Sequence, residues 1–270
     1  MNKITHNLLL LCFFFALNSI AIGQDLKLLA TIPSSINFFT TDPLGNSYIL
    51  TGNELTQYDS LGIKKLSYGQ RNFGRMRCVD ASNPMKVMLL YPDFARLEVL
   101  DSKLALQRSI DLRAFGIEQP LLACTSLNSG IWIFDQQDFQ LKKYNEQMQI
   151  LSESGNIAQR IDMELHPKQL VEHDNLLYLN NPETGILVFD AYGAYLKRIP
   201  LAGIAKIAFS GEQMLYCRAE KMYAYDLKKL EENPFIMPFD LGSSYEARIE
   251  QHKLFLNKVE KIEIYRFRID

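Results

Sequence analysis

The stretch that decides the fold is Ile36–Tyr68, which reads INFFTTDPLGNSYILTGNELTQYDSLGIKKLSY. Apolar and β-branched residues fill 36–41, 47–51, 54–58 and 63–68, and these segments are separated by Asp-Pro-Leu-Gly-Asn, Gly-Asn and Asp-Ser-Leu-Gly. Gly, Asn and Asp favour tight turns, and Gly-Asn is typical of a two-residue hairpin. Four short antiparallel strands in about 40 residues are the content of one β-propeller blade.

The same unit recurs six times along the chain. Its third strand closes each time on an aromatic residue or leucine followed by Asp or Asn. The closing residues are Asp59, Asp101, Asn145, Asp190 and Asp226, and a degenerate last copy reads Tyr265-Arg266. Second strands are predicted at 87–90, 131–134, 176–179, 214–217 and 254–256. A side chain of Asp or Asn at a strand end can bond its own backbone, so the closing residues are predicted to form Asx-turns.

The two ends of the chain predict how the ring closes. The last unit stops at Asp270, directly after its third strand, and 26–32 forms a spare strand before the first unit. Pairing this strand with 262–268 would complete the sixth blade and remove two exposed strand edges. The sequence therefore predicts an all-β fold: a six-bladed β-propeller of four-stranded antiparallel blades, closed by the N-terminal strand of the mature chain.

The first 23 residues have the features of a secretory signal peptide. A basic start at Lys3 precedes an apolar run at 8–17, and Ala21-Ile22-Gly23 forms a small-x-small cleavage site before Gln24. We therefore expect residues 1–23 to be removed and 24–270 to form a single propeller domain without a membrane span. This predicts an exported protein, either periplasmic or at the cell surface or extracellular.

Composition narrows the classes of partner. The formal net charge is −2, so the basic excess of a nucleic-acid-binding protein is absent. Outside the export signal the chain has three cysteines, Cys78, Cys124 and Cys217. The odd count leaves two alternatives open: one disulfide among the three, or small buried apolar thiols, which we favour. We expect the isolated chain to be a monomer.

Asp42–Leu50 reads DPLGNSYIL and looks like the D-x-x-G-N-x-Y phrase of NHL-type blades, with a weaker echo at 173–179. On these residues the chain resembles the six-bladed propeller superfamily that includes NHL-repeat and TolB-like proteins. Its start at Gln24 and its divergent copies look like exported envelope proteins of Bacteroidetes-type bacteria. The resemblance covers residues 24–270 and implies that ligands or partners use the mouth of the central channel.

Basic residues recur near the start of the first strand of several units. They are Arg75, Arg77, Lys168, Lys206 and Arg248. If their register holds, they form a cationic channel rim that attracts an anionic partner; the alternative is a set of ordinary exposed charges at strand ends. The loop that contains Arg71 and Phe73 is a second candidate, which would grip a carboxylate or phosphate, or be solvated.

A catalytic set is not evident in the sequence. His166, His173 and His252 lack ligand spacing, and Glu118, Glu164 and Glu246 form no coherent metal ring of the lactonase type. We therefore expect no catalytic residues, metal or cofactor. The favoured function is a non-catalytic scaffold or interaction module that caps or assists an outer-membrane barrel or secretion complex. The alternative is a lactonase-like metal-dependent hydrolase, or a propeller that binds a small ligand or glycan.

Overall fold

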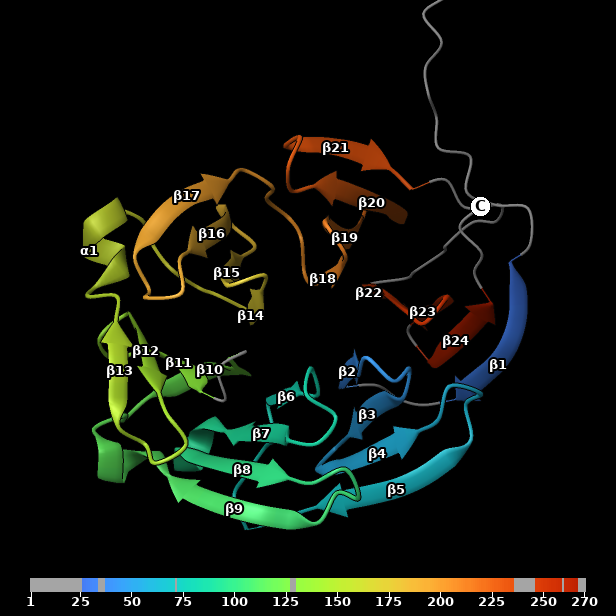
Figure 1. Ribbon diagram of the computed structural model, residues 1–270, viewed down its shortest axis with the longest axis horizontal. Coiled ribbons are helices and arrows are strands. Elements are labelled where there is room, and N and C mark those ends of the chain that lie inside the picture. The colour runs from blue at the N-terminus through green and yellow to red at the C-terminus, as the bar shows by residue number, and fades with distance from the viewer. Residues whose placement is uncertain are drawn as a thin grey trace, which may run out of the picture.

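The computed structural model describes residues 26–33, 37–70, 72–126, 130–235, 246–258 and 260–266. These residues form six four-stranded antiparallel sheets arranged around a central axis as the blades of a propeller (Figure 1). The predicted all-β six-bladed fold is therefore confirmed. Residues 1–25, which include the predicted export signal, lie outside the described residues, as does the start of the predicted first strand at 36.

In every blade the strands follow one another from the innermost to the outermost position. Blade 1 consists of β2 (Phe38–Thr41), β3 (Ser47–Thr51), β4 (Glu54–Tyr58) and β5 (Lys64–Gly69). Blade 2 consists of β6 (Cys78–Asp80), β7 (Val87–Tyr91), β8 (Arg96–Leu100) and β9 (Leu106–Asp111). Blade 3 consists of β10 (Pro120–Thr125), β11 (Ile131–Asp135), β12 (Gln140–Tyr144) and β13 (Ile150–Glu153).

The remaining blades follow the same order. Blade 4 consists of β14 (Gln169–His173), β15 (Leu176–Asn181), β16 (Gly185–Phe189) and β17 (Tyr195–Ile199). Blade 5 consists of β18 (Ile207–Ser210), β19 (Gln213–Arg218), β20 (Lys221–Asp226) and β21 (Glu231–Pro234). Blade 6 consists of β22 (Glu246–Glu250), β23 (Lys253–Lys258), β24 (Lys261–Arg266) and β1 (Lys27–Pro33). Short helices η1 (Pro92–Phe94), η2 (Leu112–Phe115) and α1 (Ile157–Ile161) lie in connections.

The ring closes through β1, as the sequence predicts. This strand pairs antiparallel with β24 (Figure 1). Lys27 lies opposite Arg266, and Ile32 lies opposite Ile262. Ile32 is the one fully buried residue of β1, and it packs in an apolar cluster with Ile262 and Ile264. Similar clusters of buried side chains lie between the other neighbouring blades, because each sheet exposes an apolar face to the next.

The closing Asp and Asn residues form the predicted Asx-turns. In each of the five, Oδ1 accepts two backbone N–H groups of the following turn at 2.8–3.0 Å. Asp101, for example, accepts from Lys103 and Ala105, and Asn145 accepts from Gln147 and Gln149. The most repeated residues of the chain therefore shape turns.

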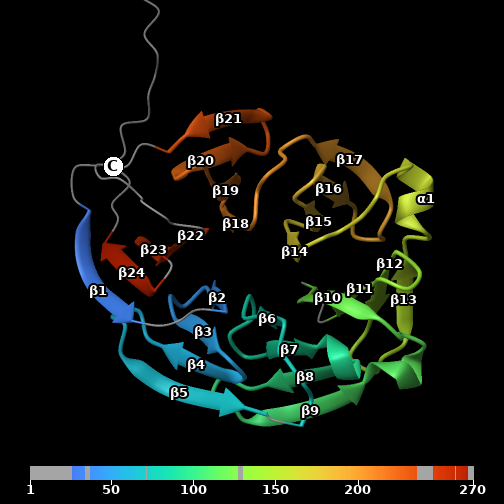
Figure 2. The ribbon, with the colours of Figure 1, turned by 180° about the vertical axis from the view of Figure 1, so that it is seen from behind.

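Antiparallel blades give the ring two distinct faces, which Figures 1 and 2 show from opposite sides. The first strands all begin on one face, together with the connections between blades; we call it the entry face. The first and third strands all end on the opposite face, where the Asx-turns lie; we call it the tip face. The two faces carry different side chains.

Candidate binding channel

The innermost strands β2, β6, β10, β14, β18 and β22 surround the central channel (Figures 1 and 2). In several blades the residue just before this strand is fixed by a backbone hydrogen bond to the second strand. Asn37, Arg77 and Lys168 each donate their N–H to a second-strand carbonyl at 2.9–3.0 Å. Because the register is the same in these blades, their side chains meet at one level of the channel.

This level is the mouth of the channel on the entry face, a hollow of about 350 Å³. Its lining includes the basic side chains of Arg77, Lys168 and Lys206 and the carboxylate of Glu246. In the described part of the chain, no carboxylate lies within ion-pair distance of these three basic residues, and Glu246 is paired with Arg248. The mouth therefore holds three cations without an anionic partner, in a concave surface that concentrates positive potential.

Lys206 reaches across the channel from blade 5 to blade 1. Its Nζ lies 4.8 Å from the centre of the Phe38 ring, in a cation–π contact. Lys206 lines both the mouth and a deeper chamber of about 190 Å³. Lys206 therefore borders both hollows.

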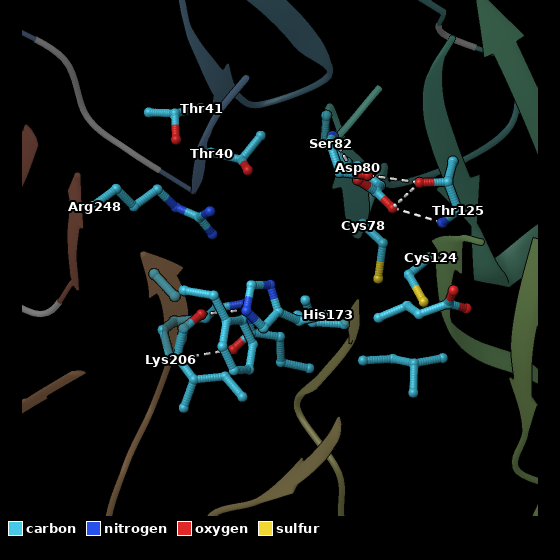
Figure 3. Close-up of a pocket in the computed structure, with 18 of the residues that line it drawn as sticks. Thr40, Thr41, Cys78, Asp80, Ser82, Cys124, Thr125, His173, Lys206 and Arg248 are labelled. Atoms are coloured by element: carbon cyan, nitrogen blue, oxygen red, sulfur yellow. Dashed lines mark hydrogen bonds between the residues drawn. The ribbon is translucent and has the colours of Figure 1, made fainter. Parts of the chain in front are cut away.

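Arg248 occupies a different position from the three mouth cations. It lines the deeper chamber, where its side chain extends into the cavity (Figure 3). Its Nη2 and Nε lie 2.8 and 2.9 Å from Oε1 of Glu246, and the two side chains are only 15% and 5% exposed. Arg248 therefore belongs to a largely buried ion pair whose two members are two residues apart on one strand.

The other predicted site residues lie outside the mouth. Arg75 is exposed and lines neither channel hollow; its backbone N–H lies 3.5 Å from Oδ2 of Asp93. Phe73 is half-buried, packs against Tyr91 at 5.8 Å between ring centres, and lies beneath the guanidinium of Arg96. Arg71 lies outside the described residues. The structure therefore does not gather the candidate loop and the mouth into one site.

The deeper chamber contains polar residues that sequence reasoning missed. Oδ2 of Asp80 accepts from the backbone N–H and the hydroxyl of Thr125 at 2.6 and 2.8 Å, which connects blade 2 to blade 3. Thr41 donates to Glu250 at 3.0 Å, which connects blade 1 to blade 6, and burial raises the pKa of Glu250. Figure 3 shows Asp80 and Thr125 on one side of the chamber and Arg248 on the other. Each of the four missed residues is the last residue of a first strand: Thr41, Asp80, Thr125 and Glu250. That common position is the signal that could have identified them.

The three cysteines are free thiols in the structure. Cys78 and Cys124 come from neighbouring innermost strands and line the chamber, while Cys217 is buried in blade 5. Burial raises the pKa of each thiol, to about 12 for Cys217, although Lys206 and Arg77 partly oppose this rise at Cys78. A protonated buried thiol is a poor nucleophile.

The described residues contain no group of three or more His, Cys, Asp or Glu side chains arranged to hold a metal ion. His173 stacks on Phe209 at 4.4 Å between ring centres, and its Nε2 lies 2.8 Å from the carbonyl of Gly211, so it connects blade 4 to blade 5. No helix among these residues has the length and apolar character needed to cross a bilayer.

Comparison with known proteins supports the fold. No protein-family model matches the chain, and no curated protein matches its sequence. Among solved structures, a streptogramin B lyase superposes with a TM-score of 0.63 at 12% identity, over 90% of this chain and 97% of the lyase. BamB from Moraxella catarrhalis superposes with a TM-score of 0.54 at 8% identity, over 90% of this chain and all of BamB. The WD40 domain of Neurospora crassa Pan2 gives 0.59 at 10% identity, over 87% of this chain and 79% of that domain. At such identities the likeness shows a shared propeller fold.

Proposed function

We propose that this chain is an exported, non-catalytic interaction module that binds an acidic segment of another envelope protein at its entry-face mouth. The observation that carries the proposal is the convergence of Arg77, Lys168 and Lys206 without carboxylate partners. Three unpaired cations around a hollow repel one another, and a carboxylate-rich partner segment would relieve that repulsion.

The ring is suited to this role because its surface is preformed. Six blades packed face to face leave little to order on binding, so little of the interaction free energy is lost to conformational entropy. The likeness to BamB, together with the apolar export-type sequence at 8–17, supports an envelope location. A component of an outer-membrane barrel or secretion complex is the proposed partner.

The test is a pull-down from envelope extract with the full chain as bait. The control bait carries Arg77→Gln, Lys168→Gln and Lys206→Gln, which keep polar side chains while removing the mouth charges. We expect a stoichiometric protein with the native bait, released by raised salt and lost with the control. Recovery of no stoichiometric protein, or equal recovery by both baits, would contradict the proposal.

The alternative of a metal-dependent hydrolase makes a different prediction. A resident calcium ion would stabilise the folded state by mass action, so the Tm would rise by several degrees with micromolar calcium. We expect no such rise, because the described residues contain no metal-binding cluster. A clear increase in Tm would favour the hydrolase instead.

A further inference from the structure

The tip face carries nearly all of the exposed large apolar side chains in the described residues. Only Phe94 and Phe115, in η1 and η2, lie on the entry face. Every blade contributes to the tip face, with one representative each in Leu28, Leu61, Met85, Ile150, Tyr192 and Leu230. An apolar set concentrated on one face differs from the scattered apolar residues normal on a protein surface.

The exposed side chains stand at turns and strand ends. Leu61 lies between β4 and β5, Tyr192 between β16 and β17, and Leu230 between β20 and β21. These turns are rigid, because Asp59, Asp190 and Asp226 fix their backbone with two hydrogen bonds each. Tyr192 is 76% exposed and Leu61 is 56% exposed, so these side chains are held out in water by a fixed backbone.

The distribution of exposed apolar side chains around the whole ring favours a partner with a flat surface over a single protein segment. Apolar residues that project from all six blades around a ring can meet a plane together, whereas one protein segment would contact only a few blades. Aromatic and aliphatic side chains with nearby lysines are typical of proteins that rest in the headgroup region of a bilayer. Lys27 and Lys103 are exposed at this face, and neither lies within ion-pair distance of a carboxylate among the described residues.

We propose that the tip face docks on a lipid bilayer, inserting its apolar turn residues among anionic headgroups while the entry face points away. The site is separate from the mouth and does not depend on the proposed function. Peripheral docking needs no membrane-spanning segment, because the contact is made by side chains at turns and by lysines that reach the lipid phosphates.

The test determines which face of the ring contacts lipid. Single cysteines introduced as Leu61→Cys or Tyr192→Cys are labelled with an environment-sensitive fluorophore in the full chain. Phe94→Cys and Phe115→Cys serve as matched controls, since both are exposed apolar residues on the opposite face. Vesicles of phosphatidylethanolamine and phosphatidylglycerol are added, and phosphatidylcholine vesicles form a second arm that lacks anionic lipid.

We expect the emission of the tip-face labels to shift to the blue with phosphatidylglycerol vesicles, and that of the entry-face labels to remain unchanged. The double variant Leu61→Ser, Tyr192→Ser should also lower vesicle partitioning by about tenfold, because two apolar contacts are lost. Labels that respond on both faces, or on neither, would overturn the proposal. A tip-face response that depends on protein concentration without vesicles would instead show that a second copy covers this face.

Discussion

At the entry face the chain places Arg77, Lys168 and Lys206 around a concave mouth, whereas at the tip face rigid turns hold apolar side chains such as Leu61 and Tyr192 in water. Both faces are built by the same repeated unit. The third strands of blades 1–5 end in Asx-turns on the tip face, whereas the residue before the first strand varies in charge from blade to blade. The repeated residues therefore build the ring, and the variable ones give each face its chemistry.

Ring closure supports both faces, so breaking it should have the largest effect. Ile32→Asp places a carboxylate among Ile262 and Ile264, and we expect it to lower the free energy of unfolding by about 4 kcal/mol. Leu28→Asp is the matched control on the same strand, because Leu28 is 49% exposed; it should cost less than about 1 kcal/mol. Urea denaturation measures both. Equal effects would mean that β1 does not close the ring through Ile32.

The next test separates the paired cation of the chamber from the unpaired cations of the mouth. Arg248→Met leaves the carboxylate of Glu246 without its ion-pair partner at 5% exposure, and we expect a loss of about 3 kcal/mol. Lys168→Met removes an exposed cation that has no ion-pair partner and should change stability by less than about 0.5 kcal/mol. Urea denaturation of the two variants in parallel measures the difference in their free energies of unfolding. A destabilised Lys168→Met protein would show that the mouth charges are structural.

A smaller effect is expected on the pH dependence of stability, through one Asx-turn of the tip face. Backbone N–H groups of Ala105 and Lys103 lower the pKa of Asp101 below its usual value of 3.8. A lowered folded pKa stabilises the protein above the unfolded pKa, and this stabilisation is lost as pH falls through the folded pKa. Asp101→Asn keeps both acceptor bonds, as Asn145 does in blade 3, but does not titrate.

The Tm of the Asp101→Asn protein should therefore fall less steeply than that of the native protein between about pH 5 and pH 2. Asp101→Ala, which loses both acceptor bonds, should have a lower Tm at neutral pH. Parallel Tm curves for the native and Asp101→Asn proteins would show that this turn does not contribute to acid sensitivity.

The sequence contained most of the information on the fold. Period, turn residues and the spare strand at 26–32 predicted six blades, ring closure and the Asx-turns, because these depend on local hydrogen bonding and on pairing of free strand edges. Three of the proposed rim residues lie at the mouth because they directly precede first strands. Arg75 lies in the connection instead, outside the register that fixes Arg77.

What could not be predicted depends on contacts between distant blades. Lys206 reaches Phe38 across the channel, from blade 5 to blade 1, and no local pattern joins these residues. Arg248 and Glu246 are two residues apart on one strand, so their side chains point to the same side of the sheet. Their burial, which makes the ion pair important for stability, could not be read directly from the sequence. The apolar tip face could not be predicted either, because its members are separated by tens of residues and meet only on one side of the ring.

The most direct test of an anion-binding mouth compares two arginines that are two residues apart. Arg77 lines the mouth and Arg75 does not, although both are exposed. Binding of a fluorescent oligoglutamate peptide to the full chain can be followed by anisotropy. We expect Arg77→Ala to weaken the affinity by about tenfold and Arg75→Ala to change it by less than about twofold. Equal losses in the two variants, or no binding to the native chain, would contradict an anion-binding mouth.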